Sequence, residues 1–166
     1  MPDTASLYDR DFFAWTQDQA ARLRAWPEHL RPNGIDIENL VEEVEDLGKS
    51  QRHAVESLLE LIVLHALKLE FHPDRQARRH WMREMNAFRA SLRQLYRNNP
   101  SLKAQRADML AQAWRDALGD FRRDLALDAP EQVAGFDSVL PLDAAPRYDV
   151  DTAVLADGWY PGPLAD

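Results

Sequence analysis

Apolar residues recur at intervals of three and four along most of the chain, up to about residue 126. We find no stretch in which apolar and polar positions alternate over the length of a strand. A period near 3.6 residues is typical of an amphipathic helix, whereas a half-buried strand has a period of two. The pattern therefore predicts an all-α fold. Four long helices are expected, over residues of about 9–26, 37–71, 75–98 and 101–126.

Short links containing proline or asparagine separate these predicted helices, at Asn33-Gly34, Pro73-Asp74 and Asn98-Asn99-Pro100. Proline and Asn-Gly pairs interrupt helices. Short links favour antiparallel neighbours, so we expect a four- or five-helix up-and-down bundle. Asp36 should cap the helix that follows it, because its carboxylate can accept hydrogen bonds from the free N–H groups of the first turn.

The predicted helix over 37–71 would be about 50 Å long if it were straight. It contains Gly48-Lys49-Ser50. Glycine is a poor residue for a helix interior and serine is a good N-cap, so we expect a break or kink there.

The predicted core comes from the apolar faces of these helices. It includes Trp15, Leu40, Val44, Leu47, Leu58, Ile62, Trp81, Met85, Phe88, Leu92, Trp114 and Phe121. Beyond Ala129 the chain holds five prolines and many aspartates. We expect an irregular tail over 129–166, packed along the bundle with at most a brief helix near 150–157. The chain is thus interpreted as one domain over 1–166, with a helical core over about 8–126.

Composition narrows the class of protein. Of 166 residues, 45% are hydrophobic and five are tryptophan, which is typical of a chain that folds. The absence of cysteine excludes disulfides, a thiolate nucleophile and a cysteine zinc site. The N-terminus lacks a basic start followed by an apolar run, and no window reaches the roughly 18–20 apolar residues of a membrane span. We therefore expect a soluble, cytoplasmic protein that does not enter a membrane.

The net charge of −8 is unevenly distributed. Residues 36–72 carry nine acidic and three basic groups, whereas 73–106 carry two acidic and nine basic groups. A further acidic segment, 107–166, follows. A basic block therefore lies between two acidic segments.

The first acidic cluster lies in the predicted helix over 37–71. On a helical wheel its members, Glu38, Glu42, Glu43, Glu45 and Asp46, fall within an arc of about 160°, opposite Leu40, Val41, Val44 and Leu47. Such a separation is typical of a solvated helix face. A weaker alternative is a metal site, because Glu38, Glu42 and Glu45 stand at i, i+4 and i+7 and His65 follows on the same helix. Carboxylate metal bundles also use Glu-x-x-His pairs, and the chain contains none, so we predict no metal and no cofactor.

The basic block forms a stripe of arginines. On a helical wheel Arg75, Arg78, Arg79, Arg83, Arg89, Arg93 and Arg97 fall within about 140°. Guanidinium groups suit carboxylate and phosphate partners. We favour a face paired with the acidic helix over 38–46 or with the acidic tail. The candidates for binding a protein partner or phosphates are Arg75, Arg79, Arg83, Arg89, Arg93 and Arg97.

Two further motifs are rejected. Gly48-Lys49-Ser50 resembles the end of a phosphate-binding P-loop, but Glu43 occupies the position of the first glycine and the preceding segment is helical. No Gly-x-Ser-x-Gly sequence supports a nucleophilic serine. We therefore predict no catalytic residue.

Several stretches resemble the bacterial family known as domain of unknown function 29. They are Tyr8-x-x-Asp11-Phe12-x-x-Trp15, Asp36-Ile37-Glu38-Asn39-Leu40-x-Glu42-Glu43-x-Glu45-x-Leu47-Gly48-Lys49-Ser50, Leu64-His65-x-Leu67-Lys68, Trp81 and Pro100-Ser101-Leu102. The resemblance extends over residues of about 8–126. It implies a compact, mainly helical protein, and it implies no activity, cofactor or catalytic residue.

We expect a non-enzymatic protein-interaction module that binds a protein partner or a second copy of itself. Segregated charges and aromatic-rich helices are suitable material for such an interface. One alternative is a nucleic-acid-associated regulatory or toxin–antitoxin-type component that uses the arginine stripe, although the acidic net charge disfavours it. A second alternative is a metal-dependent hydrolase built on Glu38, Glu42, Glu45 and His65.

Overall fold

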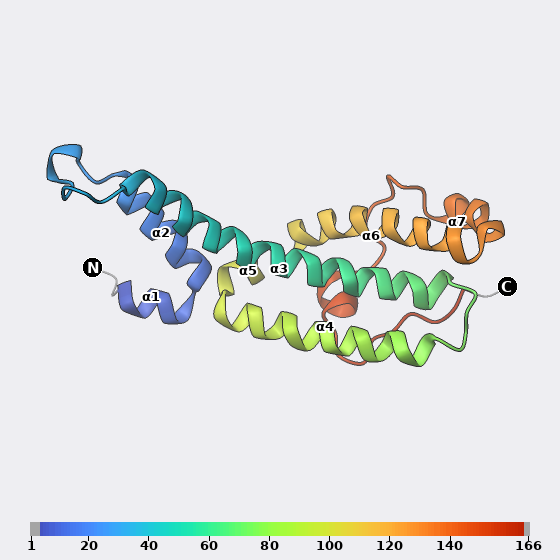
Figure 1. The fold of residues 1–166 in the computed structure, drawn as a ribbon. Coiled ribbons are helices and arrows are strands. Elements are labelled where there is room, and N and C mark those ends of the chain that lie inside the picture. The colour runs from blue at the N-terminus through green and yellow to red at the C-terminus, as the bar shows by residue number, and fades with distance from the viewer. Residues whose placement is uncertain (1–3, 165–166) are drawn as a thin grey trace. The chain divides into compact units, whose positions relative to one another are not determined.

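The computed structural model describes residues 4–164, and every long regular element in that range is an α-helix. The helices are α1 (Thr4–Arg10), α2 (Phe12–Arg24), α3 (Ile37–Phe71), α4 (Arg78–Asn98), α5 (Pro100–Ala104), α6 (Arg106–Asp128) and α7 (Val133–Val139) (Figure 1). Short helical turns cover Glu28–Leu30, Pro130–Gln132 and Val150–Val154. The all-α prediction is confirmed. None of the described helices combines the length and the apolar character needed to cross a bilayer.

Contacts divide the chain into two compact units. The first comprises Met1–Val55 and Gln94–Gln105, and the second comprises Glu56–Arg93 and Arg106–Asp166. That the whole chain forms one domain stays a prediction.

In the first unit, the helix predicted over 9–26 is divided at Asp11 into α1 and α2. Asp11 has an extended backbone conformation, and its Oδ1 accepts a hydrogen bond from the backbone N–H of Ala14 at 3.0 Å. A carboxylate in this position satisfies a free N–H of the first turn, which makes it an N-cap. The apolar period continues through Asp11, and for this reason the pattern alone did not reveal the division.

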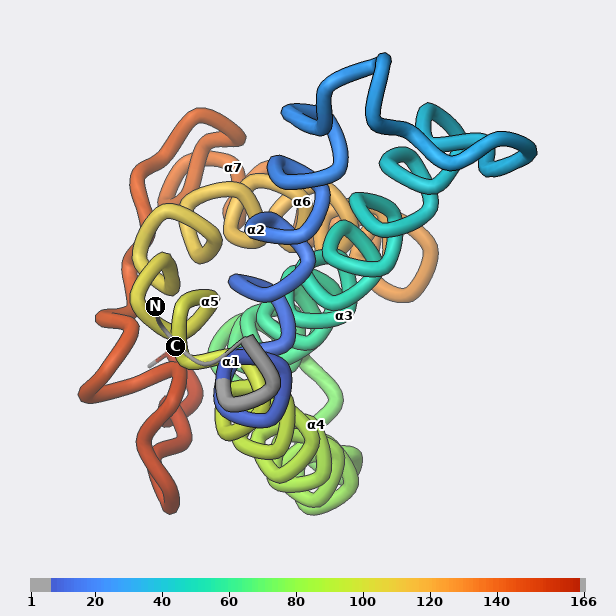
Figure 2. Tube along the Cα trace, turned by 90° about the vertical axis from the view of Figure 1, so that its left-hand side faces the viewer, coloured from blue at the N-terminus to red at the C-terminus, as the bar shows by residue number. Residues whose placement is uncertain are grey.

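The predicted break at Gly48 is wrong, because α3 is helical without interruption from Ile37 to Phe71. Gly48 is instead buried against α2. A Cβ atom built at Gly48 would lie 2.4 Å from Oγ1 of Thr16, closer than atoms can approach. Both views show α2 beside the first part of α3 (Figures 1 and 2). The glycine is therefore required for close approach of two helices, and the helix around it continues.

The core of the first unit lies between α2 and α3. It contains Ala20, Ile37 and Val41, with Leu23 and Val44 packed against them. The predicted core residues Leu40 and Leu47 are wrong, since they are 44% and 50% exposed. The face that meets α2 is centred on Val41 and Gly48, and Leu40 and Leu47 project about 80–100° to one side of it.

In the second unit, α4 runs antiparallel to the second half of α3, and α6 lies along another side of that half (Figure 1). Predicted core residues fill this unit: Ile62, Trp81, Met85, Leu92, Trp114 and Phe121 are all buried. Trp15 in the first unit and Leu58 and Phe88 in the second are half-buried.

The chain beyond Ala129 is more regular than predicted. Pro130–Gln132 and Val133–Val139 are helical. Phe136 of α7 is buried, with its ring centroid 4.9 Å from that of Phe121 and 5.3 Å from that of Phe71. These contacts and an ion pair between Asp137 and Arg122 hold α7 in place, and two such residues leave no periodic signal in the sequence. Over residues 140–164 the chain is irregular, apart from a five-residue π-helical turn at Val150–Val154.

Candidate functional site

The acidic start of α3 is ordered by a capping residue, as predicted. Oδ1 of Asp36 accepts from the backbone N–H of Asn39 at 3.1 Å, and Oδ2 accepts from the Asn39 side chain at 2.6 Å. These hydrogen bonds favour the ionised carboxylate, so they hold the pKa of Asp36 below its ordinary value.

The glutamates proposed as metal ligands lie in the first unit with arginines close by. Glu38 and Glu42 line a cavity of 280 Å³ together with Arg24 and Arg31. Oε1 of Glu45 is 2.7 Å from Nη2 of Arg24. Within residues 4–164, no group of three or more acidic or histidine side chains is arranged to hold a metal ion.

His65, the fourth proposed ligand, belongs to the second unit. Its Nδ1 is 2.7 Å from the carbonyl oxygen of Leu61, and its Nε2 is 2.7 Å from Oε2 of Glu84. Both ring nitrogens therefore face oxygen acceptors. His80 also approaches Glu84, with 3.3 Å between Nε2 and Oε1. His65 is thus occupied by an α3–α4 contact, and the structure does not bring it together with Glu38, Glu42 and Glu45.

The acidic segment also exposes two leucines, which the sequence pattern placed in the core. Leu40 and Leu47 stand seven residues apart on α3, which is close to two full turns, so they lie on one side of the helix. Both are exposed; Glu38 and Glu42 lie two residues to either side of Leu40, and Asp46 directly precedes Leu47. The segment just before α3 also exposes large apolar side chains, at Trp26, Leu30 and Ile35. This group is called the apolar edge below and consists of Trp26, Leu30, Ile35, Leu40 and Leu47.

The arginine stripe is divided by the structure into buried and exposed members. Arg89 is 1% exposed. Its Nε donates to the carbonyl of Val154 at 3.0 Å, and its Nη2 donates to the carbonyls of Ala153 at 3.1 Å and Trp159 at 3.0 Å. Nη1 of Arg89 is also buried, and none of the described residues forms a hydrogen bond with it. Burial disfavours the charge and lowers the pKa of Arg89 from its ordinary value.

Other arginines of the stripe also contact the tail, here defined as residues 141–164. Arg78 donates to the carbonyls of Leu69 and, at 3.1 Å, Pro161. Nη1 of Arg93 is 2.5 Å from Oδ1 of Asp157. Three members of the stripe, Arg78, Arg89 and Arg93, therefore hold the tail along α4. Of the three, Arg89 is buried and inaccessible to a phosphate backbone, whereas Arg93 is exposed beside Asp157.

The remaining arginines have different surroundings. Arg97 donates to Gln94 on its own helix. Arg75, Arg79 and Arg83 are exposed. Of the two partners expected for the stripe, the acidic tail supplies one, because Arg93 pairs with Asp157. Pairing with the acidic helix over 38–46 stays a prediction.

Glu70 is a buried carboxylate that was not predicted from the sequence. Glu70 accepts from Nη2 of Arg147 at 2.6 Å and from the hydroxyl of Tyr148 at 2.5 Å. Burial and the Glu70 carboxylate both raise the pKa of Tyr148 far above its ordinary value. The signal that could have revealed Glu70 is its position as a lone acid in the apolar run of residues 61–71, where a charge requires a partner.

Comparisons with known proteins support the fold and the family. A solved structure, an α-helical protein of unknown function from Rhodospirillum rubrum, resembles this chain with a TM-score of 0.67 and 23% identity. The similarity covers 92% of this chain and 90% of that one. At this identity the likeness concerns the fold. A comparison with the curated proteins finds no match.

A family model matches the chain and agrees with the resemblance seen in the sequence. That model describes DUF29, a domain of unknown function, and it matches residues 7–144. The match covers most of the chain and includes the capping residue Asp11, the acidic start of α3 and the arginines of α4. The protein therefore belongs to the DUF29 family.

Proposed function

We propose that this protein is a non-enzymatic interaction module, and that it binds a protein partner through the apolar edge of its first unit. The observation that supports the proposal is the exposure of Leu40 and Leu47 in the first part of α3, where most other exposed side chains are charged. Single exposed apolar residues are ordinary on a protein surface, but large apolar groups gathered along one segment with a charged rim mark an interaction site.

The charge of this segment indicates the chemistry of the partner. Residues 36–46 contain six carboxylates and no lysine or arginine. A second copy of the chain that presented the same face would bring two such segments together, which is unfavourable. An amphipathic helix with apolar anchors and a basic rim would instead complement both the leucines and the carboxylates. The proposed partner is therefore a basic helical segment of another protein.

The test is binding of a synthetic amphipathic helical peptide that carries leucines on one face and lysines at their flanks. Its affinity for the protein is measured by fluorescence anisotropy. The double variant L40Q/L47Q is expected to weaken binding about tenfold or more, because buried apolar anchors dominate interface energy. The matched control is L127Q, which changes a leucine that is 84% exposed in the second unit.

Three results would contradict the proposal. They are equal affinity for a peptide with the same composition in shuffled order, no effect of L40Q/L47Q, and an equal effect of L127Q. Sedimentation velocity provides a separate readout. A dimer that is lost in the double variant would overturn the choice of a basic partner and identify a second copy as the occupant.

A nucleic-acid role has weaker support, from one observation. Arg79 and Arg83 are exposed on α4, and within the described chain neither forms an ion pair or a hydrogen bond. If they contact phosphates, binding to duplex DNA should weaken steeply as salt is raised, and the double variant R79A/R83A should reduce the salt slope by about two units. Binding that is absent near physiological salt would exclude this role.

A further inference from the structure

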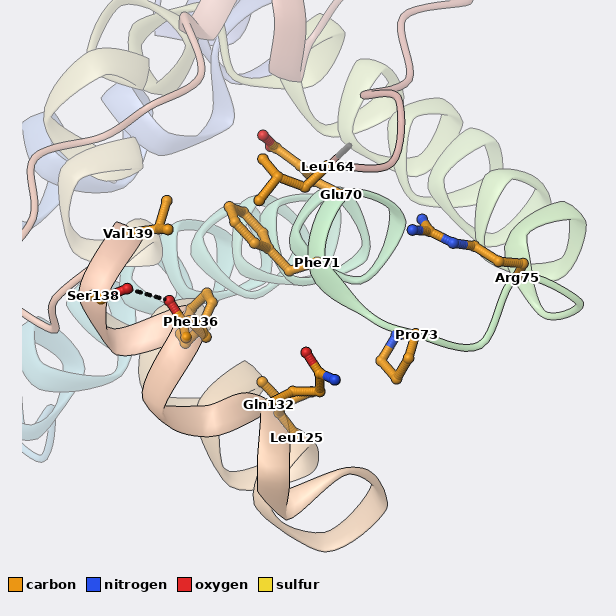
Figure 3. A pocket seen from close by; sticks show the side chains of 11 residues that line it. Glu70, Phe71, Pro73, Arg75, Leu125, Gln132, Phe136, Ser138, Val139 and Leu164 are labelled. Atoms are coloured by element: carbon orange, nitrogen blue, oxygen red, sulfur yellow. Dashed lines mark hydrogen bonds between the residues drawn. The ribbon is translucent and has the colours of Figure 1, made fainter. Parts of the chain in front are cut away.

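The second unit contains a cavity of 430 Å³ near the end of α3. It is lined by residues of α3, α6, α7, the α3–α4 link and the end of the tail (Figure 3). Pockets of about 300–1,000 Å³ are the usual size for small-molecule ligands. Its volume is therefore sufficient for a ligand with an apolar body of several carbon atoms.

The wall of this cavity is mixed, with an apolar part and a polar part. Phe71, Leu125, Phe136 and Val139 line it from three helices, and Pro73 lines it from the α3–α4 link. The rings of Phe71 and Phe136 pack edge to face, with their centroids 5.3 Å apart. Packed aromatic walls of this kind are preformed, so an apolar ligand could enter without rearranging them.

Glu70, the acidic residue of the lining, already has partners within the protein. Both carboxylate oxygens of Glu70 accept hydrogen bonds, one from Arg147 and one from Tyr148. The guanidinium of Arg147 also lies 5.7 Å from the centroid of the Phe71 ring. Because its charge is compensated and its oxygens are occupied, Glu70 does not repel an anion from the cavity.

The cationic residue of the lining is not compensated. Arg75 is exposed, lines the cavity, and within residues 4–164 it forms neither an ion pair nor a hydrogen bond. It differs in this respect from Arg78, Arg89 and Arg93, which are all engaged by the tail. A guanidinium with free donors beside an apolar cavity favours a carboxylate.

We propose that this cavity binds a small amphipathic carboxylate, with its apolar body against Phe71 and Phe136 and its carboxylate toward Arg75. The polar groups of Gln132 and Ser138 also line the cavity. The Ser138 hydroxyl donates to the carbonyl of Gly135 at 2.7 Å, which leaves its oxygen able to accept. Neither group opposes the proposed orientation.

The tail contributes one wall of the cavity. Leu164 lines it, and the backbone N–H of Leu164 donates to the carbonyl of Glu70 at 2.8 Å. Figure 3 shows Leu164 beside Glu70 at the end of α3. A ligand that contacts Leu164 would therefore also hold the end of the tail against α3.

The test uses octanoate as the probe and isothermal titration calorimetry as the measurement, with octanol and acetate titrated under the same conditions. Octanoate is expected to bind more tightly than either. The variant R75A should weaken octanoate binding by about tenfold or more, the effect of losing one charge-assisted contact, and should leave octanol unchanged. R79A is the matched control, because it removes an exposed arginine that does not line the cavity.

A second pair of variants tests the cavity itself. Gly135 lines it, and a Cβ atom built there meets no other heavy atom within 4 Å. G135A should therefore retain binding, whereas G135L should fill space in the cavity and abolish it without unfolding α7. Failure of octanoate to bind at millimolar concentration, equal binding of octanol or acetate, or binding that G135L and R75A leave intact would each overturn the proposal.

Discussion

Asp11 stands before α2 and Asn99 stands before α5, and the side chain of each one also caps the helix of the other. Asp11 precedes α2, and its carboxylate accepts from the backbone N–H of Ser101 at 2.7 Å and from the Ser101 hydroxyl at 2.9 Å, in the first turn of α5. Asn99 precedes α5, and its Oδ1 accepts from the backbone N–H of Phe13 at 2.9 Å, in the first turn of α2. Both side chains are buried. The exchange fixes two helix starts that are far apart in the sequence.

This exchange predicts a cooperative loss of stability. The variants D11A and N99A should each lower the free energy of unfolding by about 1–3 kcal/mol, because each leaves buried N–H groups without a partner. The double variant should lose less than the two single effects added together, since both act on one network. Urea unfolding measures all three. D36A, which removes an exposed N-cap, is the control and should lower the free energy of unfolding less than either buried variant.

The close approach of α2 and α3 predicts that Gly48 cannot be replaced. G48A would normally stabilise a helix by about 0.5–1 kcal/mol. Here the new Cβ would collide with Oγ1 of Thr16, which donates to the carbonyl of Phe13 at 2.7 Å and cannot rotate without losing that bond. A net loss of about 1–3 kcal/mol is expected in thermal or urea unfolding.

Two variants distinguish this collision from a general intolerance of helical glycines. G119A in α6 should be neutral or stabilising, because its Cβ would meet only the flexible end of Arg123 at 3.4 Å. T16A should reduce the cost of G48A by removing the clashing oxygen. If G48A proved as stable as the natural protein, the close contact would be contradicted.

Because Arg89 is buried and donates to the tail, we expect the folded position of the tail to depend on this residue. R89M should lower the free energy of unfolding by at least about 1–3 kcal/mol, because three tail carbonyls would lose their donors. R93A removes an exposed ion pair with Asp157 and should cost only about 0–1 kcal/mol. Limited proteolysis should cleave R89M within residues 141–164 faster than R93A. Equal cleavage of the two variants would argue against the role of Arg89.

Because the pKa of Tyr148 is raised, we expect the free energy of unfolding to fall at alkaline pH. Burial and Glu70 raise this pKa in the folded protein above the ordinary value of 10.0. The neutral phenol therefore stabilises the fold fully below about pH 10, and this contribution is lost as the pH rises beyond it, because the unfolded chain ionises first. Unfolding free energies measured between neutral and alkaline pH should show a steeper decline for the natural protein than for Y148F.

Local signals in the sequence determined the fold class and most of the helices. The 3.6-residue period, the capping carboxylate of Asp36 and the stops at Pro73 and Pro100 act over a few residues, so they can be recognised without knowing the fold. The same holds for the buried faces around Met85 and Trp114, where the apolar stripe is broad and α3, α4 and α6 cover it. The family resemblance added a compact helical fold and no function.

The tertiary structure decided what depends on which surfaces meet. Leu40 and Val41 are equally apolar, but α2 covers one and leaves the other exposed. The pattern of charges likewise could not show that Arg89 is buried by the tail while Arg75 stays exposed beside a cavity. The partners in such contacts lie tens of residues apart, up to 90 for Asp11 and Ser101. Helix periodicity is a local property, whereas burial and hydrogen bonding between distant segments follow from packing of the whole chain.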